Sequence, residues 1–128
     1  MTDRQRVLLI EDEPNIIEAI RFVLSRDGWQ VATHPEGRGA VEAVRDRMPD
    51  VLILDVMLPD RSGYDILADL RADEALRDLP IMVLTARGQS KEREMALEIG
   101  ADVFMTKPFS NAEMLEAVRA LAHRRDTA

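Results

Sequence analysis

The sequence contains no cysteine, and it lacks the basic start, apolar run and small-residue cleavage site of a secretory signal. Disulfide bonds therefore play no part in the fold, and we expect a cytoplasmic protein. Long hydrophobic runs are also missing. The longest apolar segments, such as residues 7–10 and 51–54, have the length of strands, whereas a membrane-spanning helix needs about 20 apolar residues. A membrane protein is not expected.

Basic residues are in the minority, because 17 lysines and arginines face 24 aspartates and glutamates and give a formal net charge of −7. This charge opposes the phosphate contacts that dominate nucleic-acid binding, so direct DNA binding is not expected. Hydrophobic residues make up 46% of the 128 residues, enough for one domain to bury a core without metal or disulfide staples. We expect a single domain at residues 1–128, with its core at about 5–123 and a tail or the start of a linker at 124–128.

Short segments rich in Val, Ile and Leu alternate with longer amphipathic segments along the whole chain. The expected strands are residues 7–10, 30–33, 51–54, 81–84 and 103–106. Near-continuous apolar strands separated by helices indicate a parallel sheet covered on both faces. The pattern therefore predicts a doubly wound α/β fold.

Local signals mark the ends of the expected helices. Ser62 with Asp65, and Ser110 with Glu113, have the spacing of a capping box at a helix start. Gly100 stands where a helix would end in a left-handed residue. These signals predict helices that begin near Ser62 and Ser110 and a helix that stops at Gly100.

Polar residues follow four of the expected strands. They are Glu11, Asp12 and Glu13 after the first strand, Asp55 after the third, Thr85 after the fourth and Lys107 after the fifth. Taken singly, each suits an ordinary role, since acidic residues cap helices and lysines face water. In this fold class, however, ligands bind outside the carboxyl ends of the strands. The residues therefore form a candidate site as a group.

Carboxylates would crowd at this edge of the sheet. Two such charges about 5 Å apart repel by roughly 3 kcal/mol at an effective dielectric near 20, so the group favours a counter-cation, and Mg²⁺ prefers oxygen ligands of this kind. Lys107 adds a second positive charge. A carboxylate such as Asp55 can attack phosphorus to form an aspartyl phosphate, and Thr85 can then bind the phosphoryl group.

Four segments carry a family resemblance in their order and spacing. They are residues 7–13 (VLLIEDE), 55–64 (DVMLPDRSGY), 84–86 (LTA) and 100–109 (GADVFMTKPF). On these residues the chain resembles, over essentially its whole length, the receiver domains of two-component response regulators, including the chemotaxis receivers. The resemblance implies a flavodoxin-like (βα)₅ receiver fold with strand order 2-1-3-4-5.

The resemblance also implies a phosphorylation site. Asp55 would accept a phosphoryl group from a histidine of a sensor kinase or phosphotransfer protein. Mg²⁺ would be held by Asp12, Asp55 and the backbone carbonyl of Met57, with Glu11 assisting through water. Most members carry aspartate at the position of Glu11, so an altered metal geometry is expected here.

Further residues would read the phosphorylation. Thr85 would turn toward the phosphoryl group, Lys107 would pair with it, and Phe104 would change its side-chain orientation. The Lys107–Pro108 peptide bond would be cis, although sequence alone favours trans. The family is a signalling switch and not a metabolic enzyme, since it catalyses only its own phosphorylation and dephosphorylation.

The resemblance predicts that the signal leaves through the fourth helix, fifth strand and fifth helix, toward a partner or output domain. The chain would act as a monomer or a phosphorylation-dependent homodimer. Val103 and Ala117 stand where related receivers with winged-helix domains have an aspartate and a basic residue, so the ion pairs of their dimer would be incomplete. Met57 and Arg87 occupy positions that tune phosphoryl loss, and neither activates water, so we expect a long-lived phosphoryl state.

Three alternatives remain open at this point. A pseudo-receiver would keep the fold without phosphorylation, but intact Asp12, Asp55, Thr85 and Lys107 argue against it. A hydrolase of the haloacid-dehalogenase group needs a second aspartate where Met57 stands. A flavodoxin needs a phosphate-binding loop after the first strand, where the acidic residues 11–13 would repel phosphate.

Overall fold

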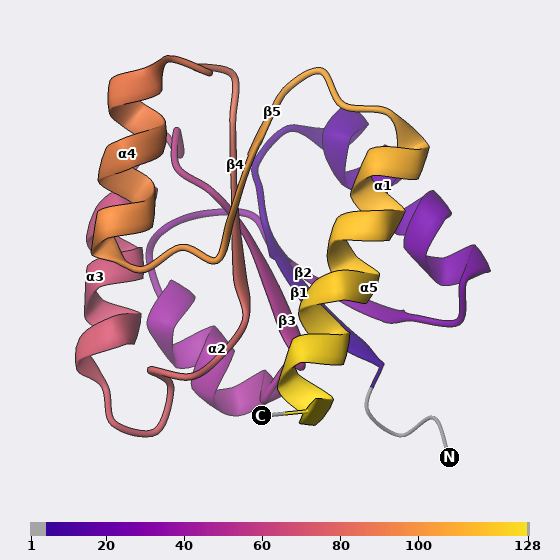
Figure 1. Ribbon diagram of the computed structural model, residues 1–128, viewed down its shortest axis with the longest axis horizontal. Coiled ribbons are helices and arrows are strands. Elements are labelled where there is room, and N and C mark those ends of the chain that lie inside the picture. Colours follow the sequence, from indigo (N-terminus) through magenta and orange to yellow (C-terminus); the bar gives the residue numbers. More distant parts are fainter. Residues whose placement is uncertain (1–4, 128) are drawn as a thin grey trace.

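Five parallel strands form one sheet in the computed structural model, which describes residues 5–127, with side chains described through Arg124. The sheet order is β2-β1-β3-β4-β5 (Figure 1). The strands are β1 (Arg6–Ile10), β2 (Gln30–His34), β3 (Val51–Asp55), β4 (Ile81–Thr85) and β5 (Val103–Thr106). The predicted doubly wound α/β fold and its strand order are confirmed.

Five helices cover the two faces of this sheet. They are α1 (Pro14–Arg26), α2 (Ala40–Arg47), α3 (Gly63–Ala72), α4 (Ser90–Ile99) and α5 (Asn111–Thr127). Helices α1 and α5 lie together on one side, and α2, α3 and α4 lie on the other (Figure 1). Within the described residues, no helix is both long and apolar enough to cross a membrane.

α5 extends beyond residue 123. The sequence predicts a core that ends near residue 123, but α5 continues through Thr127. Arginine is a good helix former, and Arg124 Nη2 lies 3.4 Å from Asp102 Oδ1, which ties this last part of the helix to the start of β5. Residues 124–127 therefore prolong the helix.

The core consists of two apolar layers, because successive side chains of a strand point to opposite faces of the sheet. Leu8, Leu52 and Leu54 pack with buried residues of α2 and α3 on one face. Leu9 and Ile53 pack with buried residues of α1 and α5 on the other. Both faces of the central strands are thus apolar, and their polar residues lie at the strand ends.

One predicted capping box forms and the other does not. At α5, Ser110 N–H donates to Glu113 Oε1 at 2.9 Å, and Glu113 N–H donates to Ser110 Oγ at 3.0 Å. At α3, Ser62 Oγ accepts from Tyr64 N–H instead, and Asp65 N–H donates to the backbone oxygen of Ser62. The side chain of Asp65 is one methylene shorter than that of a glutamate, which favours this simpler cap.

Candidate functional site

The carboxyl ends of β1, β3, β4 and β5 meet at one rim of the sheet, at the top of Figure 1. Glu11 directly follows β1, and Asp55 is the last residue of β3. Glu11, Asp12 and Asp55 each place a carboxylate oxygen within 4.8 Å of the others. The fold therefore brings the predicted acidic residues together.

Asp55 is buried, and both of its carboxylate oxygens have partners. Oδ1 accepts a hydrogen bond from Met57 N–H at 2.9 Å, which fixes the first turn of the loop after β3. Oδ2 lies 3.3 Å from Lys107 Nζ. The side chain is thus held in one orientation between its own loop and the residue that follows β5.

Glu11 is fully buried and holds the loop after β1. Its Oε2 accepts from the backbone N–H groups of Asp12 at 3.1 Å and Glu13 at 3.0 Å. Oε1 lies 3.0 Å from Lys107 Nζ, outside hydrogen-bonding angles. Burial raises the pKa of Glu11 to about 7, and the Asp55 carboxylate adds to the rise, while Glu13 N–H and Lys107 oppose it. This carboxylate therefore has an oxygen to offer a further cation.

Lys107 is the positive charge of the site. Its Nζ lies 2.9 Å from Glu13 Oε1, 3.0 Å from Glu11 Oε1 and 3.3 Å from Asp55 Oδ2. Burial works to lower the pKa of Lys107, but the hydrogen bond to Glu13 and the nearby carboxylates of Glu11 and Asp55 outweigh it and hold the pKa above its ordinary value. The Lys107–Pro108 peptide bond is cis, the geometry that the resemblance implies.

Glu13 is a contact of Lys107 that the sequence reasoning missed. Glu13 follows the expected metal ligands directly, and it was given no role of its own. The only signal in the sequence is the run of three acidic residues at 11–13. Nothing local connects it to a lysine 94 positions later, so only the fold reveals the pair.

Thr85 and Phe104 are the two predicted switch residues, and the Thr85 carbonyl accepts from Lys107 N–H at 2.8 Å. Thr85 is buried at the end of β4, and its Oγ1 accepts from Arg87 N–H at 3.0 Å, so the hydroxyl is engaged by its own loop. Phe104 is a buried residue of β5 that pairs in register with Val83 of β4. Both side chains are therefore packed inward in this structure.

The loop after β3 is closely packed against its surroundings. Gly63 N–H donates to the Val56 carbonyl at 3.1 Å, and a Cβ on Gly63 would lie 2.4 Å from Val56 Cα and 2.6 Å from the Asp55 carbonyl oxygen. Asp60 Oδ1 and Oδ2 accept from Gly37 N–H and Arg38 N–H, each at 2.8 Å, and these bonds lower the pKa of Asp60. These contacts fix the backbone around Asp55.

A divalent cation fits this donor set. Three carboxylates converge, and Glu11 Oε1 is buried without a hydrogen-bond partner among the described residues. Hard cations such as Mg²⁺ select oxygen ligands and use few carboxylates, keeping the other positions for water and phosphate. The Met57 side chain, two residues after Asp55, is exposed.

A family model, the response regulator receiver domain, matches residues 7–119. The chain belongs to this family. The receiver is similar to KdpE of Mycobacterium tuberculosis, a transcriptional regulatory protein, with 47% identity over 122 residues that cover 95% of this chain and 52% of KdpE. The receiver spans about half the length of the curated relatives it matches.

Solved receiver structures agree with the fold. The receiver domain of sensor histidine kinase PA1611 from Pseudomonas aeruginosa PAO1, solved with a magnesium ion in its active site cleft, has a TM-score of 0.84 and 31% identity, and covers 93% of this chain and 98% of that one. The beryllofluoride-activated NtrC4 receiver domain dimer has a TM-score of 0.87 and 26% identity, and covers 94% and 98%. Membership of the family sets aside the dehalogenase and flavodoxin alternatives.

Proposed function

We propose that this receiver is a phosphorylation-dependent switch in which Asp55 accepts the phosphoryl group. The observation that carries the proposal is the position of the buried Asp55 carboxylate, 3.3 Å from Lys107 Nζ and within 4.8 Å of the carboxylates of Glu11 and Asp12. A nucleophilic carboxylate, a cation-binding group and a fixed ammonium are the parts that phosphoryl transfer needs.

Mg²⁺ is the cofactor in this proposal. Asp12, Asp55 and the backbone carbonyl of Met57 would hold the ion, and Glu11 would assist them. When bound, the ion offsets negative charge on the carboxylates and on the transferred phosphoryl oxygens. Glu11 would assist through water with Oε1, while Oε2, which accepts from two backbone N–H groups, fixes the loop after β1.

The phosphoryl donor is a phosphohistidine of a sensor kinase or phosphotransfer protein. A carboxylate oxygen of Asp55 attacks phosphorus, the P–N bond breaks, and its electron pair returns to the imidazole of the donor. Lys107 donates to the oxygens of the phosphoryl group and balances part of their charge. Thr85 turns its hydroxyl to the same group, which loosens its present contact with Arg87 N–H.

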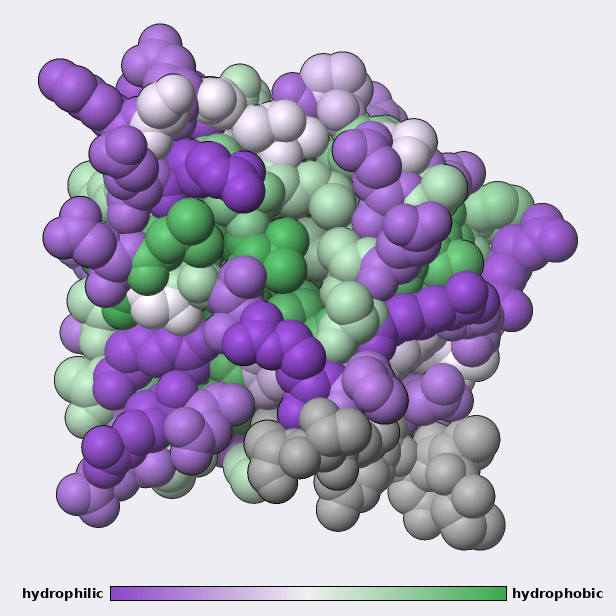
Figure 2. All heavy atoms as spheres, viewed as in Figure 1, coloured by the Kyte–Doolittle hydropathy of each residue, from purple (hydrophilic) through white to green (hydrophobic). Residues whose placement is uncertain are grey.

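The movement of Thr85 would change the surface formed by α4, β5 and α5. Phe104 of β5 re-packs when Thr85 moves, and the surface then meets a partner or an output domain. Figure 2 shows hydrophobic residues gathered over the middle of this face between hydrophilic margins, and Met95 and Leu97 of α4 are exposed. The receiver would act as a monomer or a phosphorylation-dependent homodimer, without contacting nucleic acid itself.

The receiver is not a conventional enzyme, and its chemistry is confined to gaining and losing its own phosphoryl group. We keep residues 1–128 as one receiver domain, in which residues 124–128 would lead toward any output domain. A cytoplasmic location, expected from the sequence, belongs to the same proposal.

Acetyl phosphate with magnesium tests the proposal without the kinase. Labelling that accumulates on Asp55, located by peptide mass analysis, is the expected result. Steady release of phosphate without accumulation would indicate a hydrolase. A protein that neither accumulates label nor releases phosphate would be a pseudo-receiver.

A further inference from the structure

Glu13 occupies the N-cap position of α1, yet its side chain makes no capping hydrogen bond. A short side chain such as aspartate at this position ordinarily accepts from the free N–H groups of the first helical turn, whereas the glutamate side chain is one methylene longer. Here the carboxylate reaches away from the helix, and its Oε1 lies 2.9 Å from Lys107 Nζ. The Glu13 carboxylate therefore contacts Lys107 and not the helix.

The ammonium group of Lys107 donates hydrogen bonds to Glu13 and Asp55 and forms an ion pair with Glu11. A lysine ammonium has three donors, and three carboxylates lie near it, those of Glu13 at 2.9 Å, Glu11 at 3.0 Å and Asp55 at 3.3 Å. The most distant of the three is Asp55, the proposed acceptor. A phosphoryl group on Asp55 would bring new oxygens that compete for the same donors.

The burial of Glu11 and Glu13 determines which of the two carboxylates would lose its contact with Lys107. The Glu11 side chain is 0% exposed, so losing Lys107 would leave a buried carboxylate without its counter-charge. The Glu13 side chain is 58% exposed and can return to water. An exposed ion pair of this kind is weak. Phosphorylation would thus replace Glu13, and not Glu11, at Lys107.

We propose that Glu13 is a positioning residue that competes with the phosphoryl group of Asp55 for Lys107 and so weakens the phosphorylated state relative to the unmodified one. This inference rests on the proposed function. Removing the contact would release one donor of Lys107 and strengthen binding of a phosphoryl group at Asp55. The effect is about twofold to fivefold, the range expected for an exposed ion pair.

Beryllofluoride, an anion with the shape of a phosphoryl group, measures this competition at equilibrium in the presence of magnesium. We would compare Kd for beryllofluoride in the unaltered protein and in Glu13→Gln, Glu13→Asp and Glu18→Gln. Glu13→Asp keeps the charge, but its shorter side chain falls back from Lys107 and suits the N-cap of α1. Glu18 is an exposed residue of α1 and is not one of the three carboxylates at Lys107.

The contact model predicts that Glu13→Gln and Glu13→Asp both lower Kd about twofold to fivefold, while Glu18→Gln leaves it unchanged. If Glu13→Asp keeps the Kd of the unaltered protein, the charge and not the contact matters, and the inference is overturned. Equal Kd values in all four proteins overturn it as well. If the unaltered protein binds no beryllofluoride, the proposed function itself fails, which is a different result. Thermal unfolding of each variant checks that the fold is intact.

Discussion

Lys107 Nζ lies 3.3 Å from Asp55 Oδ2, although 52 positions separate the two residues in the sequence. Asp55 ends β3, and Lys107 follows β5, so β4 runs between the strands that carry them. Parallel strands end at the same rim, and the lysine side chain spans the remaining distance. The sheet order is therefore what places a fixed positive charge beside the proposed phosphoryl acceptor.

Replacing Gly63 with alanine should destabilise the receiver by about 2 kcal/mol or more, the cost of overpacking a close contact. The new Cβ would lie 2.4 Å from Val56 Cα and 2.6 Å from the Asp55 carbonyl oxygen, and backbone atoms cannot move aside cheaply. Urea unfolding measures the change. Gly88→Ala is the comparison and should lose less stability, because its Cβ would lie 2.6 Å from Thr106 Cγ2, a methyl group of an exposed side chain and not a backbone atom. Equal losses in the two variants would contradict the close packing at Asp55.

Replacing Met57 with asparagine should shorten the life of the phosphoryl group. The Met57 side chain is 44% exposed beside Asp55, and its thioether is a poor partner for water. An amide that orients an attacking water by one hydrogen bond, worth about 1 kcal/mol, would speed phosphoryl loss about fivefold. Decay of labelled protein measures the rate. Met95→Asn, at an exposed methionine of α4, should leave it unchanged, and an unchanged decay in Met57→Asn would refute the prediction.

The ion pair between Asp27 and Arg119 should make stability depend on pH. Arg119 Nε donates to Asp27 Oδ2 at 3.0 Å, linking α5 to the end of α1, and the Arg119 guanidinium lowers the pKa of Asp27 below its ordinary value of 3.8. A lowered pKa stabilises the fold above the ordinary value, and this stabilisation is lost as the pH falls through the folded-state pKa.

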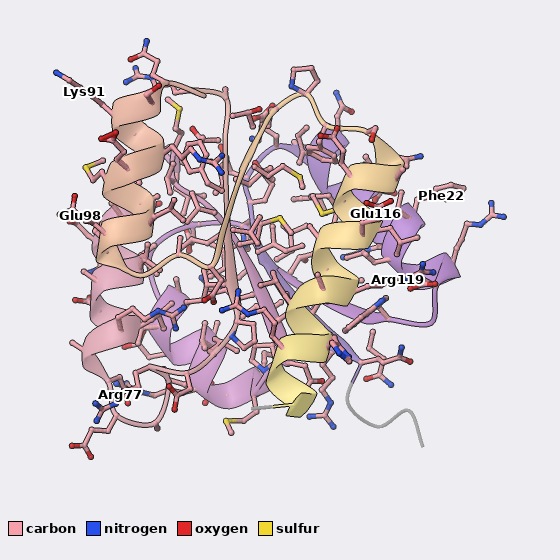
Figure 3. The ribbon with its side chains drawn as sticks, in the orientation of Figure 1. Phe22, Arg77, Lys91, Glu98, Glu116 and Arg119 are labelled. Atoms are coloured by element: carbon pink, nitrogen blue, oxygen red, sulfur yellow. The ribbon has the colours of Figure 1, made fainter. Side chains whose placement is uncertain are left out.

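The variant Asp27→Asn tests this dependence. It should be less stable than the unaltered protein at pH 7, and the difference should shrink as the pH falls below about 4. Glu98→Gln, on the separate helix α4 (Figure 3), should show no such convergence. Urea unfolding at several pH values measures it. A difference that stays constant with pH would show that Asp27 acts through packing and not through its charge.

The sequence predicts the sheet well, because the central strands are continuous apolar runs. β3 and β4 each extend one residue beyond the predicted range, and the added residues are Asp55 and Thr85 of the site itself. Polar residues at a strand end break the apolar pattern, so pattern alone stops before them. The pairing of these strands then determines which polar residues share the rim.

Other features depend on contacts that no local pattern contains. In the sequence, Glu13 stands at an expected helix start, but in the structure its carboxylate accepts a hydrogen bond from Lys107. Ser62 and Asp65 have the spacing of a capping box, but the short aspartate leaves a simpler cap. Near the end of α5, Arg124 contacts Asp102 across 22 positions of the sequence. Local spacing gives the candidates, and the tertiary fold decides among them.

The central claim is that Asp55 is the phosphoryl acceptor. The most direct measurement is the extent of acetyl-phosphate labelling, with magnesium, of the unaltered protein and of Asp55→Asn. Asparagine keeps the size and the contact with Met57 N–H but removes the nucleophilic carboxylate. The account predicts label on the unaltered protein and none on the variant. Equal labelling of the two proteins would contradict it.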